Sequence, residues 1–117
     1  MALNITQGER IMLGRRRANV SQQDFARRRK VSQSLVSRWE SGELEPPAKV
    51  GKMYKGLGRL TKVESSIVMR KRMGKTVLDI AQALCVSRYQ ATKMAKGEVE
   101  STEYFKYITD EYVKYDA

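Results

Sequence analysis

The sequence predicts an all-α protein of two small helical units in tandem, followed by a C-terminal amphipathic helix. Capping boxes and glycine stops delimit apolar-periodic segments, and no stretch has the alternation expected of a strand. An internal repeat points to duplication: Ala26 recurs as Ala81, 55 residues later. The same offset relates Asp24 to Asp79, Val31 to Val86, Ser32 to Ser87, Gly42 to Gly97 and Glu43 to Glu98. Such a fixed period indicates two copies of one structural unit.

The first unit is expected to contain four helices. Thr6 and Glu9 form a capping box, in which each side chain bonds the backbone N–H of the other residue. Asn19 suits the end of this helix, because asparagine tolerates left-handed backbone. The four helices are expected from Thr6 to about Ala18, from Ser21 to the turn before Ser32, from Ser32 to Gly42, and from Pro47 through Tyr54.

The second half restarts in the same way after a linker at Gly56-Leu57-Gly58, where two glycines weaken helix strongly. The predicted domains are 1–57, 58–100 and 101–117. Helices are expected from Thr61 to near Met73, from Thr76 to Leu84, from Ser87 to Gly97, and from about Ser101 to Tyr115.

The C-terminal helix carries an aromatic and apolar stripe on one face. Tyrosine is favoured where one end of the ring is buried and the other is wet, so an interface is predicted. The stripe is expected to pack either on the chain's own body or on a second chain. Its members are Tyr104, Phe105, Ile108, Tyr112 and Tyr115.

The composition favours a nucleic-acid partner over catalysis. The 117 residues include 23 basic and 13 acidic side chains, a net charge of +10, which suits a polyanion better than it suits a merely soluble basic protein. With no histidine and a single cysteine, no cofactor, metal site or enzyme is predicted, and a reducing, cytoplasmic setting is expected. No apolar run approaches the roughly 20 residues that span a bilayer, and no membrane association is expected.

Residues 21–47 carry a specific motif. It reads Ser-Gln-x-x-Phe-Ala, then Val-Ser-Gln-Ser-x-Val-Ser-Arg-Trp-Glu-x-Gly, then a double proline. The segment from Thr6 to Tyr54 resembles the DNA-binding domain of the Cro/cI (Xre) family of phage and bacterial regulators. The resemblance implies a lambda-repressor-like fold of five helices, in which the second and third form a helix-turn-helix.

The same resemblance implies that the helix 32–41 enters the major groove of DNA. Glutamine pairs bidentately with adenine and arginine with guanine, and the capped N-terminus of the helix favours a phosphate. The basic run 27–30 is expected to contact phosphates rather than to be only a solvated face. The predicted DNA-binding residues of this unit are Gln22, Arg28, Lys30, Ser32, Gln33, Ser34, Ser37 and Arg38.

Three positions need separate interpretation. The family usually has leucine and then glycine before the valine of the turn, where this chain has Arg29 and Lys30; left-handed backbone is therefore expected at Lys30. Glu40 is expected to pair with an arginine of the first helix, such as Arg10 or Arg17, rather than to act as a catalytic carboxylate.

The second copy keeps scaffold residues and changes the reading residues. Cys85 occupies the turn and is expected to be a small structural residue rather than a reactive thiol. This copy either contacts DNA or is a vestigial unit serving dimerisation. Its predicted DNA-binding residues are Arg88, Tyr89, Thr92 and Lys93.

The predicted function is a sequence-specific DNA-binding transcriptional regulator of phage or bacterial type. It is expected to act as a homodimer on double-stranded DNA, associated with the nucleoid, by blocking a promoter or by recruiting RNA polymerase. One alternative is an antitoxin or antirepressor whose main partner is another protein. Another is a non-specific nucleoid or RNA binder, which the varied polar face from Gln33 to Arg38 disfavours.

Overall fold

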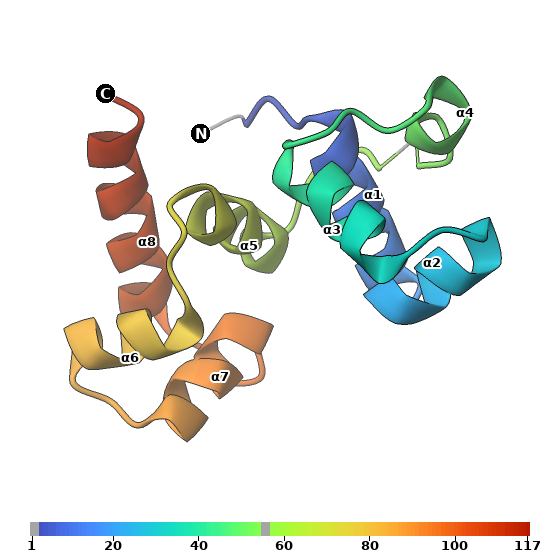
Figure 1. Cartoon of the computed structure of the whole chain (residues 1–117). Helices are drawn as coiled ribbons and strands as arrows, with labels where there is room; N and C mark the ends of the chain where they lie inside the picture. Colours follow the sequence, from blue (N-terminus) through green and yellow to red (C-terminus); the bar gives the residue numbers. More distant parts are fainter. Residues whose placement is uncertain (1–2, 55–56) are drawn as a thin grey trace. The chain divides into compact units, whose positions relative to one another are not determined.

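The computed structural model describes residues 3–54 and 57–117, and within these ranges it contains eight α-helices and no strand (Figure 1). The all-α class is therefore confirmed. Contacts divide the chain into two compact units, Met1–Arg59 and Leu60–Ala117. The helices are α1 (Gln7–Arg17), α2 (Gln22–Arg29), α3 (Gln33–Ser41), α4 (Ala48–Gly51), α5 (Lys62–Arg72), α6 (Val77–Leu84), α7 (Arg88–Lys96) and α8 (Thr102–Tyr115).

Local capping explains where most of these helices begin. In seven of them the N-cap is a serine or threonine whose hydroxyl accepts from the backbone N–H three residues on; the caps are Thr6, Ser21, Ser32, Thr61, Thr76, Ser87 and Ser101. The exception is α4, where Pro47 is the N-cap and no side chain caps the helix. The expected fourth helix through Tyr54 was too long, because α4 ends at Gly51. Gly56 of the expected linker lies outside the described residues.

The internal repeat is reproduced helix by helix. Helices α1, α2 and α3 are 11, 8 and 9 residues long, and α5, α6 and α7 have the same lengths in the same order. Both ends of each of these helices are shifted by the same 55 residues. Left-handed backbone also recurs, at Lys30 (φ 59°) and Cys85 (φ 57°). The two units therefore share one backbone plan up to the ends of α3 and α7.

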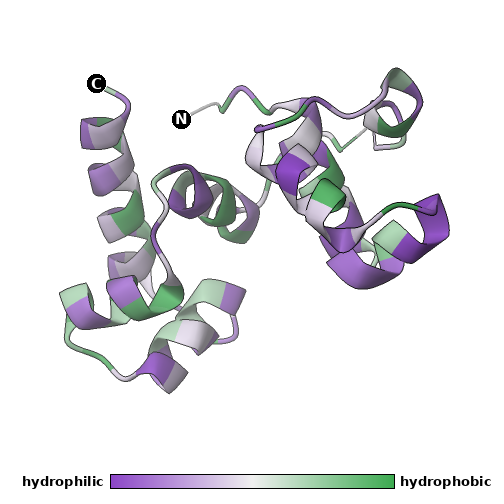
Figure 2. Ribbon diagram, in the orientation of Figure 1, coloured by the Kyte–Doolittle hydropathy of each residue, from purple (hydrophilic) through white to green (hydrophobic). Residues whose placement is uncertain are grey.

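Close helix contacts in the first unit depend on small residues. A Cβ at Gly8 of α1 would collide with the carbonyl oxygen of Trp39 in α3, so only glycine allows this approach. In Figure 2 most of α2 is purple, which reflects its arginines and glutamines. Its two buried residues are Phe25 and Ala26, so α2 has a narrow apolar face and a broad hydrophilic one.

In the second unit, α8 packs against α5 and completes the core. Tyr104, Ile108 and Tyr112 are buried there, with exposed fractions of 3% or less. Of the two alternatives for the aromatic stripe, these three side chains pack on the chain's own body. Tyr115 differs, because 59% of it is exposed.

Candidate nucleic-acid interface

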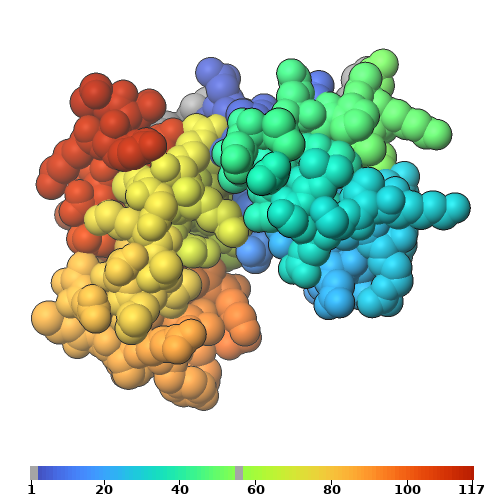
Figure 3. All heavy atoms as spheres, viewed as in Figure 1, coloured from blue at the N-terminus to red at the C-terminus, as the bar shows by residue number. Residues whose placement is uncertain are grey.

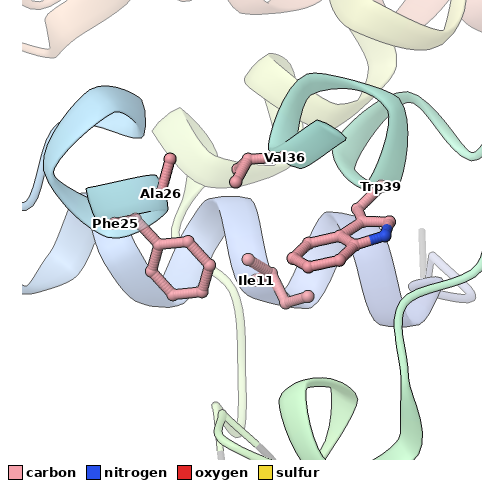
Figure 4. Close-up of a cluster of buried hydrophobic side chains, with 5 residues drawn as sticks. All are labelled: Ile11, Phe25, Ala26, Val36 and Trp39. Atoms are coloured by element: carbon pink, nitrogen blue, oxygen red, sulfur yellow. The ribbon is translucent and has the colours of Figure 1, made fainter. Parts of the chain in front are cut away.

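Helix α3 is held by an apolar core that α1, α2 and α3 build together. Figure 4 shows Ile11 of α1 reaching between the rings of Phe25 and Trp39, with Ala26 and Val36 beside them. All five side chains are at most 4% exposed. Because these contacts join all three helices, they fix the angle at which α3 is presented to solvent.

The turn between α2 and α3 is closed by backbone hydrogen bonds. Lys30 adopts the left-handed conformation, as expected, and the N–H of Val31 donates to the carbonyl of Ala26 at 3.0 Å. Ser32 then caps α3 by accepting from the N–H of Leu35. The N-terminal turn of α3 therefore starts at a fixed place, with its end exposed to solvent.

The outward face of α3 carries the predicted reading residues. Ser34, Ser37, Arg38 and Gln33 are all exposed, whereas Val36 and Trp39 of the same helix are buried. Arg38 lies 4.0 Å from the Glu43 carboxylate, a loose surface pair with both side chains more than half exposed. Such a pair holds Arg38 only weakly, so its guanidinium is available to a ligand.

A polar network links this face to the interior of the unit. The Arg15 guanidinium donates two bonds to the Glu40 carboxylate, at 2.7 and 2.9 Å, with the two side chains 10% and 6% exposed. The Gln22 amide donates to the same carboxylate at 3.2 Å, and Gln33 donates to the Gln22 carbonyl oxygen at 3.2 Å. Thus a buried ion pair orients Gln22, and Gln22 orients Gln33.

The expected pairing of Glu40 with an arginine of the first helix is confirmed, but the arginine is not one of the two named. Glu40 pairs with Arg15, not with Arg10 or Arg17. On α1, Gly8, Ile11 and Arg15 recur at helical spacing in one stripe, and each of them meets α3 or the core that it shares with α1. That stripe was the available signal, because Arg15 lies one turn after Ile11.

The basic segment that follows lies beside the turn. Arg27 contacts the Asp24 carboxylate at 3.5 Å, and the Arg29 guanidinium lies 5.9 Å from the centre of the Phe25 ring. The predicted phosphate contacts Arg28 and Lys30 are both exposed. In Figure 3 the cyan atoms of α2 lie on the drawn surface of the first unit. Exposed cations next to the N-terminus of α3 give this edge a positive potential.

In the second unit the predicted residues lie on α7. Arg88 and Tyr89 are exposed, Thr92 and Lys93 are half-buried, and Ala91 is buried. The Lys93 ammonium lies 4.7 Å from the centre of the Tyr89 ring, and the Thr92 hydroxyl donates to the carbonyl of Arg88. The structure thus places the four side chains on one helix, with two of them exposed and two half-buried.

One carboxylate of the second unit has a shifted pKa. The N–H and hydroxyl of Thr76 hydrogen-bond the Asp79 carboxylate and hold the pKa of Asp79 below its ordinary value. This group caps α6, so the shift reflects a structural role.

In the described residues, no cluster of three or more histidine, cysteine or acidic side chains could hold a metal ion. None of the described helices is long and apolar enough to cross a bilayer. Cys85 is exposed and unpaired.

The first unit has the geometry of a DNA-binding helix-turn-helix domain: two short helices, a left-handed turn and an exposed polar second helix. Residues 11–52, about a third of the chain, match the family model described as helix-turn-helix. The match covers α2, α3 and the turn between them, and it agrees with the resemblance of this segment to the DNA-binding domain of the Cro/cI (Xre) family. Searches of curated proteins and of solved structures found no match.

Proposed function

We propose that the protein is a sequence-specific transcriptional regulator of phage or bacterial type, which reads the major groove with α3. The observation that carries this proposal is the network from Arg15 through Glu40 and Gln22 to Gln33. A helix that bound DNA only through charge would need no oriented amide at its start. An amide held in position loses less rotamer entropy on binding, and a glutamine amide matches the donor and acceptor of adenine.

Contacts to the sugar-phosphate backbone complete the proposed mode of binding. Arg28 and Lys30 lie on the exposed edge of α2, and Ser32 leaves the first N–H groups of α3 directed to solvent. Cations and a helix N-terminus both favour phosphate oxygens. Ser34 and Ser37 present hydroxyls on the face between Gln33 and Arg38, and Arg38 suits the O6 and N7 acceptors of guanine.

Regulation would follow from occupancy of the site, either by blocking a promoter or by contacting RNA polymerase. We propose a nucleoid-associated protein of the bacterial cytoplasm that binds as a homodimer. Selection of bound sequences from random double-stranded DNA tests this arrangement. A twofold-symmetric motif supports the homodimer, and a longer asymmetric motif indicates that one chain binds alone.

The proposal is tested with Gln33→Ala and Arg38→Ala in the full chain. Each is expected to cost about 1–3 kcal/mol on the selected site and much less on random DNA, because each removes a contact to a base edge. Lys49→Ala, which removes an exposed charge from α4 of the same unit, is the control. Equal losses on specific and random DNA for both reading variants would overturn the assignment of α3.

A further inference from the structure

We propose that the second unit is a second binder of double-stranded DNA, which inserts α7 into a major groove and recognises bases by a different chemistry from α3. The reading side chains are Tyr89, Arg88 and Lys93, with Thr92 between them. The inference rests on the proposed function of the first unit, which brings the chain to DNA and makes the second contact intramolecular.

The scaffold that presents α7 repeats the one that presents α3 in detail. The Arg15 guanidinium donates to the Val20 carbonyl at 3.2 Å, and Arg70 makes the equivalent bond to Lys75 at 3.4 Å. The turn bond from Val31 recurs at Val86 with the same length, 3.0 Å. A serine or threonine cap and a left-handed residue stand at equivalent positions in the two units, so α7 is presented within its unit as α3 is within the first.

The two copies of the repeat have the same net charge, but their basic residues stand at different positions. Residues 7–42 contain nine basic and three acidic side chains, and residues 62–97 contain eight and two, so both carry +6. In the first unit the basic residues gather at positions 27–30 of α2 and the turn; the corresponding positions 82–85 have none. Instead α7 itself has Arg88, Lys93 and Lys96, where α3 has only Arg38. The cations therefore lie on the helix that would enter the groove.

The second unit has exposed apolar side chains as well as these cations, one of them on α7 and one on α6. Tyr89 is 69% exposed, and Leu78 at the start of α6 is 45% exposed. Val77 and Arg88 occupy the positions of Gln22 and Gln33, so the hydrogen bond between these two amides has no counterpart in the second unit. An aromatic ring and aliphatic groups suit the methyl group of thymine, and Arg88 suits guanine or phosphate.

Double-stranded DNA fits this face better than a protein partner does. The cores of protein interfaces are depleted in lysine, yet the Lys93 ammonium lies directly over the Tyr89 ring. An ammonium held over an aromatic ring stays solvated on its other side and can meet a phosphate while the ring edge meets a base.

The test is selection from random double-stranded DNA with the full chain and three variants: Tyr89→Ala, the double variant Arg88→Ala/Lys93→Ala, and the control Lys114→Ala, which removes an exposed cation from α8. The parent is expected to select two segments in each half-site of a twofold motif, and Tyr89→Ala to lose base preference in one segment of each half-site. Replacing thymine by uracil in that segment should weaken the parent about fourfold per methyl group and leave Tyr89→Ala unaffected. The double variant should reduce the slope of log affinity against log salt by about 1.8, and the control should leave it unchanged.

The inference is overturned if both α7 variants keep the motif and the salt slope of the control. Gln33→Ala separates this failure from failure of the proposed function. A single segment per half-site that disappears with Gln33→Ala and is indifferent to Tyr89→Ala would refute the second reader and support the first. Absence of any selected motif in the parent would refute both.

Discussion

The ion pair between Arg15 and Glu40 makes a strong prediction about stability. Both side chains are at least 90% buried, and two hydrogen bonds of 2.7 and 2.9 Å join them. In Glu40→Gln the Arg15 charge stays buried without a counter-charge, and one bond is replaced by a contact between two N–H donors. Removing one partner of a buried pair typically costs 3–5 kcal/mol. Since glutamine keeps one acceptor oxygen, we expect a loss of about 3 kcal/mol.

Trp39 provides the assay. It is the only tryptophan of the chain, it is 4% exposed, and it lies in the first unit, so its fluorescence reports the unfolding of that unit alone. A unit of this size has only about 3–5 kcal/mol of stability, so Glu40→Gln should bring it close to its unfolding midpoint in water. Urea titration measures the difference in the free energy of unfolding between the parent and the variant, and an added osmolyte keeps the variant folded at the start of the titration.

Two comparisons show whether the reasoning holds. Arg15→Met/Glu40→Met removes both charges and should be more stable than Glu40→Gln, because it leaves no unpaired buried charge, although the Val20 carbonyl loses its bond from Arg15. Glu43→Gln, which breaks the exposed 4.0 Å pair with Arg38, should cost less than about 1 kcal/mol. If Glu40→Gln cost no more than Glu43→Gln, or if the double variant were as unstable as Glu40→Gln, the buried-charge explanation would be refuted.

Two further predictions concern backbone strain and pH. Lys30→Gly should stabilise the first unit by about 1 kcal/mol in the Trp39 assay, because glycine adopts φ 59° without a Cβ penalty. The control Arg28→Gly, within helix α2, should destabilise the unit by a similar amount. A lower free energy of unfolding in Lys30→Gly than in the parent would contradict the strain argument. The Asp79 carboxylate has a folded-state pKa below its ordinary value, so its stabilisation is present above about pH 4 and is lost as pH falls through the lowered pKa. Asp79→Ala should therefore lower the Tm of the second unit at neutral pH but not in strong acid, as followed by circular dichroism. An equal decrease in Tm at both pH values would show that the ionised carboxylate is not what stabilises the unit.

The helix ends could be predicted because they depend on short-range chemistry. A serine or threonine cap accepts a bond from three residues on, and a glycine such as Gly42 or Gly97 ends a helix in left-handed backbone, so the signal lies within a few positions. The left-handed conformation of Lys30 was expected for a different reason, because the Cro/cI (Xre) family that the segment resembles usually has glycine at this position. Where a proline gave the only signal, at Pro47, the length of the helix was overestimated.

Long-range pairing was harder to predict, because it depends on which face of a helix is buried. Arg10, Arg15 and Arg17 all lie on α1, and charge alone does not distinguish them as partners of Glu40. Only Arg15 shares the buried stripe with Ile11. Likewise, the periodicity of α8 showed an apolar stripe but not what covers it; the answer, α5, requires the tertiary structure.

The two units differ in the partner of an arginine that both have at the equivalent position of their first helix. Arg70 occupies the position of Arg15 and makes the same backbone bond, but Ala95 stands where the first unit has Glu40. In the second unit the nearby group is the Tyr104 hydroxyl of α8; burial raises the pKa of Tyr104, and the charge of Arg70 opposes this rise. The arginine therefore interacts with α8 instead of with the end of α7. No buried carboxylate extends from Arg70 toward the reading helix, so the side chains of α7 are positioned by local contacts such as that of Lys93 with Tyr89. In the first unit, by contrast, a series of hydrogen bonds from the buried ion pair reaches Gln33. On this argument the first unit discriminates strongly between base sequences, whereas the second adds affinity and a weaker preference.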